Sequence, residues 1–377
     1  MKNKIIAIVI NTSWNVFNFR RGLLKTLQAK GCKIVIIAPK DDYSEKLESF
    51  GFEYHDIAIN GKGTHPIEDI KLTYTFYKLY KEIRPDVILH YTIKPNIYGT
   101  IAASLLGIHT INNIAGLGTL FVKEDLITSI AKKLYKYSQA KANHIFFQNK
   151  DDKNQFEKEG LVQSEKCSIL PGSGIDVSKY IPIEKDDDGV IRFLLIARML
   201  WEKGIGEYVD AAKIIKQKYN NVEFQLLGFL DVENRSAISR KQMNEWVKDG
   251  HINYLGVTDD VPRYIAKADC IVLPSFYREG TPRILLESAS MAKPIITTDN
   301  VGCRDVVDDG INGYLCEVRN ADDLALKMEM MLELSEKERV YMGKAGRGKM
   351  IEEYDEYIVI QKYLEIISKV SKVSTQY

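Results

Sequence analysis

Short apolar runs alternate with longer amphipathic segments along most of the chain. In the first half, β-branched residues are frequent in the runs at 4–10, 33–37 and 87–89, which favours strands. A segment with helical periodicity follows each run, at 17–28, 42–50 and 96–106. This alternation is typical of βαβ units and predicts a parallel sheet with helices on its faces.

The second half repeats the pattern. Strands are predicted at 191–197, 223–227, 270–273 and 294–297, and helices at 205–217, 261–268 and 282–291. The chain is therefore expected to be an α/β protein with two Rossmann-like, doubly wound domains, residues 1–170 and 171–354. Ligands of such domains bind at the carboxyl ends of the strands, so we expect a cleft between the two domains.

Two segments between the predicted domains have hinge-like sequences. Residues 170–174 are rich in Pro and Gly, and residues 184–189 are polar. A last amphipathic helix is predicted at 354–373, and it needs a surface on which to pack.

Length and composition agree with this picture. The 377 residues, 45% hydrophobic and 27% charged, suit two soluble globular domains. The apolar run at 5–10 is shorter than a signal-peptide core and far below the roughly 20 residues that span a bilayer. The five cysteines are scattered singly and are expected to be reduced. We therefore expect a cytoplasmic protein.

The charge is divided unevenly along the chain. The formal net charge is +1, but residues 1–180 hold 25 Lys and Arg against 18 Asp and Glu, a net +7. The remaining residues hold 27 against 33, a net −6. Such asymmetry suggests that the first half meets an anionic surface. Nucleic acid is not among the expected partners.

The segment 270–287 carries the most informative chemistry. A buried strand is predicted to end at Leu273, with Thr281 as the N-cap and Pro282 as the first residue of the next helix. The backbone N–H groups of Arg283 and Ile284, together with the helix dipole, suit a phosphate.

Two carboxylates and two cations surround this helix start. Glu279 precedes the helix and Glu287 lies in its second turn, so they can accept hydrogen bonds from hydroxyls on two parts of one ligand. Arg198 and Lys203 follow the strand at 191–197 and can neutralise a diphosphate. Taken singly, all four fit ordinary surface residues; taken together, they favour a diphosphate site.

A metal site is not expected. A metal-dependent enzyme of this kind would carry paired aspartates after a strand, whereas the acidic run at 186–188 lies in a charged linker. We interpret that run as a solvated loop and expect no metal or other cofactor.

These residues resemble the retaining glycosyltransferases of family 4, whose fold of two Rossmann-like domains is called GT-B. Glu279 and Glu287 match the family's Glu-x7-Glu motif, and Arg198 and Lys203 match its Arg-x4-Lys pair. Residues 170–176 and 254–313 are also similar to the family, and the resemblance is strong over about 165–350.

The resemblance implies a role for each matching residue. Glu279, with Gly280 and Thr281, would hold the donor sugar, Glu287 the ribose, and Arg198 and Lys203 the diphosphate. Backbone near Gly228 and Val257 would border the base. The helix at 355–377 would cross back to the first domain.

The first domain departs from the family pattern. The loop at 11–20 has no glycine pair, and His90 is displaced by one residue from the family's His-x-His, which turns it to the opposite face of a strand. His90 is therefore either an acceptor contact or a packing residue.

Residues 91–96 and 112–119 are similar to one branch of the family. Its members add sugars, often N-acetylgalactosamine, to undecaprenyl-diphosphate-linked saccharides in O-antigen, capsule or N-glycan assembly. Arg20 and Lys94 are then candidate contacts for the acceptor diphosphate. Gly116 and Gly118 suit close approach of the acceptor, although an ordinary turn explains them equally well.

The segment at 127–143 has a helical apolar stripe with Lys132, Lys133 and Lys136 on its other side. It is either a solvated helix or a surface that docks on anionic lipid. Because a lipid-linked acceptor would require docking on the membrane, we expect an anionic membrane surface as a partner and a peripheral location on the inner face of the plasma membrane.

The expected function is transfer of a sugar from a UDP-sugar to a lipid-diphosphate-linked saccharide, with retention. Two alternatives remain open: a UDP-sugar 2-epimerase-like GT-B enzyme, which needs no acceptor, and a non-catalytic two-lobed sugar-binding protein.

Overall fold

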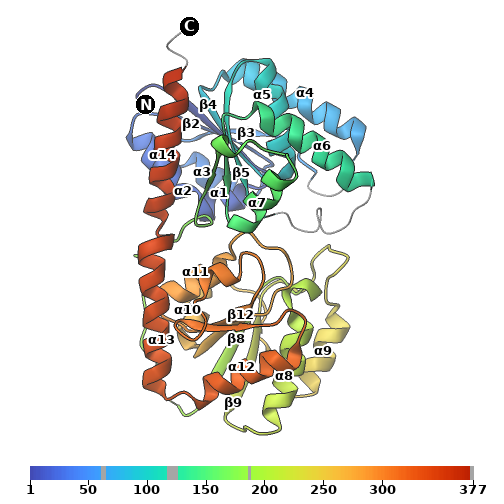
Figure 1. Cartoon of the computed structure of the whole chain (residues 1–377), viewed down its shortest axis with the longest axis vertical. Helices are drawn as coiled ribbons and strands as arrows, with labels where there is room; N and C mark the ends of the chain where they lie inside the picture. The colour runs from blue at the N-terminus through green and yellow to red at the C-terminus, as the bar shows by residue number, and fades with distance from the viewer. Residues whose placement is uncertain (61–64, 117–125, 186–187, 374–377) are drawn as a thin grey trace. The chain divides into compact units, whose positions relative to one another are not determined.

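The computed structural model describes residues 1–60, 65–116, 126–185 and 188–373. The chain divides into two compact units (Figure 1). Unit 1 consists of Met1–Gly174 and Glu356–Tyr377, and unit 2 of Ile175–Asp355. The domain boundaries predicted from the sequence, after residues 170 and 354, lie four residues and one residue before the observed boundaries.

Unit 1 is built on a seven-stranded parallel sheet of order β3-β2-β1-β4-β5-β6-β7. The strands are β1 (Ile5–Val9), β2 (Lys33–Ala38), β3 (Glu53–Asp56), β4 (Val87–Tyr91), β5 (His109–Ile114), β6 (His144–Phe147) and β7 (Cys167–Ile169). The chain moves outward from β1 to β3 and then crosses back to β4. The switch point of the sheet thus lies between β1 and β4.

Helices cover both faces of this sheet. They are α1 (Ser13–Phe19), α2 (Arg21–Ala29), α3 (Ser44–Glu48), α4 (Pro66–Ile83), the π-helix η1 (Pro95–Gly99), α5 (Thr100–Leu105), α6 (Leu126–Lys141), α7 (Lys150–Lys158), the 3₁₀ turn η2 (Ser164–Lys166) and α14 (Glu356–Val373). On one face Leu24 and Leu27 of α2 pack with Ile6 and Ile8, and on the other Phe76 of α4 packs near Val9.

The C-terminal helix α14 belongs to unit 1, as the family resemblance implies. Val359, Tyr363 and Ile367 are at most 3% exposed and join the core beside α2. Their spacing of four residues gives α14 the apolar stripe that the sequence predicts. The helix starts at Glu356 rather than 354, because residues Met350–Tyr354 form the π-helix η5.

Unit 2 contains a six-stranded parallel sheet of order β10-β9-β8-β11-β12-β13. The strands are β8 (Ile191–Ile196), β9 (Val222–Leu227), β10 (Asn253–Tyr254), β11 (Cys270–Leu273), β12 (Ile295–Thr298) and β13 (Gly313–Cys316). The other elements are η3 (Trp201–Lys203), α8 (Ile205–Lys216), α9 (Arg240–Lys248), α10 (Val261–Lys267), α11 (Arg283–Ser290), η4 (Arg304–Val306), α12 (Ala321–Glu333), α13 (Glu336–Lys349) and η5. Two doubly wound α/β units confirm the predicted fold class.

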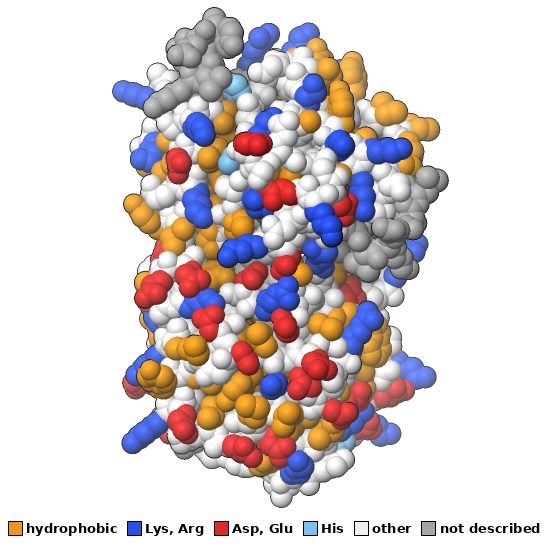
Figure 2. Space-filling model, in the orientation of Figure 1, with side chains coloured by type: hydrophobic (Ala, Val, Ile, Leu, Met, Phe, Trp, Pro, Cys, Tyr) orange, Lys and Arg blue, Asp and Glu red, His pale blue; other side chains and the backbone are white. Residues whose placement is uncertain are grey.

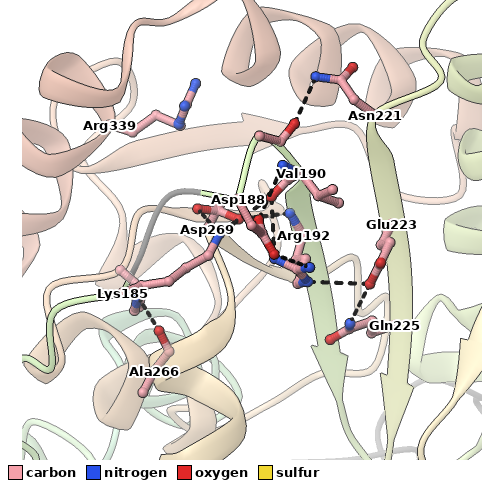
Figure 3. Close-up of polar contacts among 12 residues, drawn as sticks. Lys185, Asp188, Val190, Arg192, Asn221, Glu223, Gln225, Ala266, Asp269 and Arg339 are labelled. Carbon is pink, nitrogen blue, oxygen red and sulfur yellow. Dashed lines mark hydrogen bonds and ion pairs between the residues drawn. The ribbon is translucent and has the colours of Figure 1, made fainter.

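The polar segment at 184–189 is not a hinge between the units. Figure 3 shows how it is held to the sheet of unit 2. Lys185 pairs with Asp269 at 2.6 Å, and Asp188 pairs with Arg192 at 2.6 Å. Asp186 and Asp187 lie outside the described residues. Ion pairing at both ends of the segment explains why its polar composition does not make it a linker.

Two predicted helices of unit 1 are interrupted. The segment at 17–28 breaks at Arg20, whose φ of −123° and ψ of −5° separate α1 from α2. The segment at 96–106 begins as the π-helix η1 and continues as α5.

None of the helices in the described ranges combines the length and apolar character that crossing a membrane requires.

Candidate active site

The sheet of unit 2 brings two loops together at its carboxyl edge. β8 and β11 are neighbours, and the helices that follow them, α8 and α11, pack on opposite faces. Open α/β sheets bind ligands at such a switch point. The loop after β8 carries Arg198 and Lys203, and the loop after β11 carries Glu279. The structure therefore assembles three predicted residues at one edge of the sheet.

Lys203 and Glu279 form an ion pair between these two loops. Their side chains are 14% and 13% exposed. Ser275 Oγ donates a hydrogen bond to Glu279 Oε1 at 3.1 Å, and Lys203 Nζ lies 5.4 Å from the centre of the Tyr277 ring. Because salt screens a partly buried pair less than an exposed one, these charges act strongly on a ligand bound beside them.

Backbone hydrogen bonds and close packing hold the two loops together. The N–H groups of Phe276 and Tyr277 donate to Glu202 O at 3.0 and 3.1 Å. Gly204 has a φ of 74°, and a β-carbon there would clash with the carbonyl oxygen of Pro274. Position 204 therefore requires glycine for both its backbone angle and its space.

The loop after β12 lies against the backbone of Glu279. Gly302 has a φ of 80°, and a β-carbon there would clash with Gly280 O and lie 2.7 Å from Glu279 O. Asn300 Nδ2 also donates to Tyr277 O at 3.0 Å. This third loop fixes the backbone from which the Glu279 side chain projects.

Arg198 is exposed, unlike Lys203. Burial raises the pKa of Tyr277; the charge of Glu279 raises it further, whereas the charge of Arg198 lowers it. Both charges therefore act on the same phenol. Arg198 is placed to meet an anion that enters from solvent.

The helix predicted to start at Pro282 begins one residue later. Pro282 is the N-cap of α11, with an extended ψ of 117°, so Thr281 lies in the loop and is not the N-cap. Arg283 and Ile284 are the first two helical residues. Their N–H groups therefore sit at the positive end of the helix dipole, where an anion is favoured.

Glu287 lies in the second turn of α11 and accepts two hydrogen bonds on Oε1. Tyr180 Oη and Arg283 Nε donate to it, each at 3.0 Å. Burial, followed by the charge of Glu287, raises the pKa of Tyr180 to about 12, so the phenol remains a donor. Glu287 is thus held by Tyr180 and by a residue one turn earlier on its own helix.

Gly228 and Val257 follow β9 and β10, on the other side of β8. Gly228 has a φ of 138°, and a β-carbon there would clash with the carbonyl oxygen of Ala197. Tyr254 Oη donates to Gly228 O at 2.7 Å, and Val257 is 50% exposed. Both residues lie at the carboxyl edge that also carries Arg198.

Unit 1 has a cavity of about 220 Å³ at the carboxyl edge of its own sheet. Asn11 follows β1, Lys94 follows β4 and Gly116 follows β5, and all three line it. Lys94 pairs with Asp69 at 2.8 Å, and the two side chains are 12% and 7% exposed. Gly118 lies outside the described residues.

Arg20 is buried and has unused donors. It is 5% exposed, and its guanidinium carbon lies 4.5 Å from the centre of the Tyr91 ring. Nε and Nη1 have no hydrogen-bond partner in the described parts of the chain. A buried guanidinium of this kind keeps hydrogen-bonding capacity for an anion.

His90 is a packing residue. It is fully buried, Tyr80 Oη lies 2.9 Å from Nε2, and Asn112 Oδ1 lies 3.0 Å from Nδ1. Burial lowers the pKa of His90 to about 3, so the ring is neutral. Of the two interpretations of His90, these contacts favour the packing residue, because its strand position turns it into the packed face beneath α4 and α5.

Sequence reasoning missed three supporting residues: Ser275, Gly302 and Tyr180. The position of Ser275 just after a predicted strand indicates only a turn, and a glycine in the loop after a predicted strand is the available signal for Gly302. Tyr180 has no local signal, since it meets Glu287 from 107 residues away in the sequence.

Over the described residues, no group of three His, Cys, Asp or Glu side chains is arranged to hold a metal ion.

Two family models match the chain. The "Glycosyl transferases group 1" model covers residues 176–349, and the "Glycosyl transferase 4-like" model covers residues 5–149. Together they span most of both units, and they favour a transferase over the epimerase and binding-protein alternatives.

Curated relatives and solved structures agree. The chain is 28% identical to N,N'-diacetylbacillosaminyl-diphospho-undecaprenol alpha-1,3-N-acetylgalactosaminyltransferase of Campylobacter jejuni, over 97% of this chain and 99% of that one. It is 27% identical to UDP-Gal:alpha-D-GlcNAc-diphosphoundecaprenol alpha-1,3-galactosyltransferase of Escherichia coli, over 68% of each chain. The crystal structure of Anabaena HepE in complex with UDP shares the fold, with a TM-score of 0.79 and 15% identity over 97% of this chain and 100% of that one. The chain therefore belongs to the group 1, or family 4-like, glycosyltransferases.

Proposed function

We propose that this glycosyltransferase moves N-acetylgalactosamine or a related hexose from a UDP-sugar to a lipid-diphosphate-linked saccharide, with retention of configuration. The Lys203–Glu279 pair carries the proposal. It sets a cation suited to a leaving diphosphate beside a carboxylate suited to sugar hydroxyls. The relatives from C. jejuni and E. coli, both named for undecaprenyl-diphosphate-linked acceptors, support this substrate class. The product would serve O-antigen, capsule or glycan assembly.

In this proposal the donor lies along the carboxyl edge of the unit 2 sheet. Arg198 and Lys203 bind the diphosphate, together with the N–H groups of Arg283 and Ile284 at the start of α11. Glu279 binds sugar hydroxyls with Gly280 and Thr281 beside it. Glu287 binds the ribose, and backbone near Gly228 and Val257 borders the base.

The transfer step follows from these positions. The acceptor oxygen bonds to C1 on the face from which the diphosphate leaves, while the bond between C1 and the diphosphate oxygen breaks. The acceptor proton passes to the departing phosphate oxygen. Lys203, Arg198 and the α11 N-terminus stabilise the charge that develops on the diphosphate, and such preorganised electrostatics is usually the largest catalytic contribution. Two fixed cations make a metal ion unnecessary for this step, and we propose that none is used.

Unit 1 is the proposed acceptor side. The buried donors of Arg20 and the ammonium of Lys94 suit a diphosphate, and the cavity that Lys94 and Gly116 line lies at the same sheet edge. The net +7 of residues 1–180 would favour an anionic, lipid-linked acceptor over a neutral one.

We also propose that unit 1 docks on an anionic membrane, chiefly through α4. Ile67, Ile70 and Tyr74 are 84%, 71% and 58% exposed and share one face at helical spacing. Lys71 and Lys78 lie beside them, and Lys78 Nζ is 4.6 Å from the centre of the Tyr74 ring. Figure 2 shows hydrophobic and basic side chains gathered over this part of unit 1. An apolar stripe flanked by lysines fits the boundary between lipid tails and anionic headgroups.

Helix α6, the predicted docking helix, also exposes apolar residues. Ile130 and Tyr137 are 51% and 55% exposed rather than packed, because Tyr135 and Ser138 form its buried face. Lys132 pairs with Glu159 at 2.9 Å. The side chain of Ile127 is outside the described set. A peripheral position on the inner face of the plasma membrane remains part of the proposal.

Transfer assays test the proposed reaction. Radiolabelled UDP-sugars and, as controls, GDP-sugars are incubated with polyprenyl-diphosphate-linked mono- and disaccharides, with and without EDTA. We expect a UDP-sugar to give a lipid-linked product, of retained configuration by NMR, whose yield EDTA leaves unchanged. Conversion of the UDP-sugar at equal rate without acceptor, and no lipid-linked product, would reject the proposal.

A further inference from the structure

The cavity of unit 1 combines two unsatisfied polar atoms with an apolar wall. It lies at the switch point between β1 and β4, where Asn11 follows one strand and Thr92 the other. A volume of about 220 Å³ is below the range typical of drug-sized ligands, so it suits one monosaccharide rather than an oligosaccharide.

Asn96 lines this cavity, and a hydrogen bond holds its side-chain amide in one orientation. The residue is 1% exposed, and its Nδ2 donates to Asn113 O at 2.8 Å, which fixes the orientation of the amide. Its Oδ1 is buried and has no partner in the described parts of the chain. An unpaired buried carbonyl costs about 1–3 kcal/mol, so its retention indicates a ligand that donates an N–H or O–H there.

Thr92 is held in a conformation that its side chain disfavours. Its φ is 66°, in the left-handed region that a β-branched residue rarely adopts. Thr92 lines the same cavity, and its buried Oγ1 atom also lacks a partner within the described ranges. Strain of this kind gathers at binding sites, where it places a group for a ligand. Thr92 Oγ1 can donate to a carbonyl oxygen.

The remaining wall is largely apolar. Ile59, Ile93, Ile114 and Tyr135 line the cavity together with the ion-paired Lys94. A sugar ring that carries only hydroxyl substituents would place polar groups against these apolar side chains. An acetamido substituent has one N–H for Asn96 Oδ1, one carbonyl for Thr92 Oγ1 and a methyl group for the isoleucines.

We infer that this cavity binds an N-acetylated sugar of the acceptor, with Asn96 and Thr92 reading the acetamido group and Ile93 contacting its methyl. This inference rests on the proposed function, since it names the acceptor sugar for which unit 1 is built. It goes further in assigning specificity to three residues of the segment 91–96, to which the family resemblance gives no individual role.

The first test reads binding without catalysis. Saturation-transfer NMR is recorded on the full chain with methyl N-acetyl-α-galactosaminide and with methyl α-galactoside. We expect the acetamido methyl to receive the largest saturation, and Asn96→Ala and Ile93→Ser each to reduce it at least threefold. Ile93 is 41% exposed, so Ile93→Ser keeps the test available if Asn96→Ala does not fold. The matched control Leu105→Ser changes a residue that is 69% exposed on α5 and leaves the signal unchanged.

The second test uses transfer. Two polyprenyl-diphosphate-linked acceptors that differ only in an acetamido or a hydroxyl group are compared by kcat/KM. We expect the wild type to prefer the acetamido acceptor at least tenfold, and both cavity variants to lose most of this preference. Equal saturation of the methyl in wild type and variants, or an unchanged preference, overturns the inference. A methyl signal that depends on Asn96 and Ile93 without transfer to either acceptor supports the cavity and rejects the proposed reaction instead.

Discussion

Lys203 and Glu279 form an ion pair between two loops, although the proposed reaction assigns them to different parts of the donor. Ser275 Oγ and the ring of Tyr277 lie beside the pair. A diphosphate brings negative charge next to Lys203, and sugar hydroxyls bring donors to Glu279. Donor binding can therefore replace the ion pair with contacts that satisfy each partner separately. Removing either partner alone takes the opposite charge away from a group that is largely shielded from solvent.

Lys203→Ala should lower kcat/KM by about 100-fold or more, since preorganised charge contacts at a leaving group typically contribute that much. The same variant should bind UDP about tenfold more weakly, because the diphosphate loses its shielded cation. Turnover with saturating acceptor and calorimetric titration of UDP measure the two effects. Lys213→Ala is the control: Lys213 is also on the β8–α8 segment but pairs at the surface with Asp210. Wild-type affinity for UDP in Lys203→Ala would remove the diphosphate assignment.

Variants of Glu279 and Glu287 should differ in which part of the donor they fail to bind, the sugar or the nucleotide. Glu279→Ala is expected to abolish transfer while keeping measurable affinity for UDP, because that carboxylate is assigned to the sugar. Glu287→Gln is expected to weaken UDP and UDP-sugar about equally, since the amide is a poorer partner for Tyr180, Arg283 and ribose hydroxyls. Titrating each variant with UDP and with UDP-sugar checks this. The assignment is wrong if the two variants have interchanged binding profiles.

Gly302→Ala should reduce activity although Gly302 is not assigned to any substrate. A β-carbon there clashes with Gly280 O and presses on Glu279 O, so the carboxylate shifts. Gly310→Ala is a matched control: its φ of 75° is similar to the 80° of Gly302, but nothing lies within 4 Å of the added carbon. Both variants should lose about 1–2 kcal/mol of stability from the left-handed backbone. Only Gly302→Ala should also lose kcat by tenfold or more, and equal kcat in the two variants would contradict this.

The sequence predicts those parts of the fold and site that depend on short segments. β8 and β11 are central strands with continuous apolar runs, so their ends, and hence Arg198, Lys203 and Glu279, can be placed from periodicity and turn residues. Neighbouring strands at the switch point then bring the loops together. The edge strand β10, Asn253–Tyr254, is too short to give such a signal.

Contacts between distant segments could not be predicted. The pairing of Lys203 with Glu279 joins residues 76 positions apart, and the approach of Gly302 to Gly280 depends on the spacing of whole strands. The break of the first helix at Arg20 likewise depends on tertiary packing, because its guanidinium stacks on Tyr91 of β4. Residue type marks these positions as unusual, but only the fold shows what they touch.

Replacing the apolar stripe of α4 should weaken membrane binding. The triple variant Ile67→Ser, Ile70→Ser, Tyr74→Ser removes three residues that are at least 58% exposed, so the fold should persist. Co-sedimentation with vesicles containing anionic lipid should fall several-fold, because the stripe supplies the apolar contact. For the wild type, raising the salt concentration should weaken the same binding, since it screens the lysines. The control Val340→Ser, Tyr341→Ser changes two exposed residues of α13 in unit 2. Equal sedimentation of both variants, or binding to neutral vesicles at all salt concentrations, would contradict the docking surface.

The buried His90 should make unit 1 sensitive to acid. Burial lowers its pKa from 6.5 to about 3. Between these two pH values the unfolded chain therefore binds a proton at His90 that the native chain does not bind. Stability contributed by the neutral ring is complete above pH 6.5 and falls as the pH drops towards 3, by about 1.4 kcal/mol per pH unit. His144, whose pKa burial lowers to about 4, acts in the same direction.

Urea unfolding at pH 7, 6 and 5 measures this dependence. His90→Gln should be less stable at pH 7, because Tyr80 and Asn112 lose their partner, but its stability should fall less steeply with acid. His251→Gln, in the loop before β10 of unit 2, should keep the wild-type slope. The difference between the slopes of wild type and His90→Gln isolates the proton at position 90. If the slopes coincide, His90 accepts a proton in the native state. The description of its ring as neutral and fully hydrogen-bonded, and with it the packing role of His90, would then be wrong.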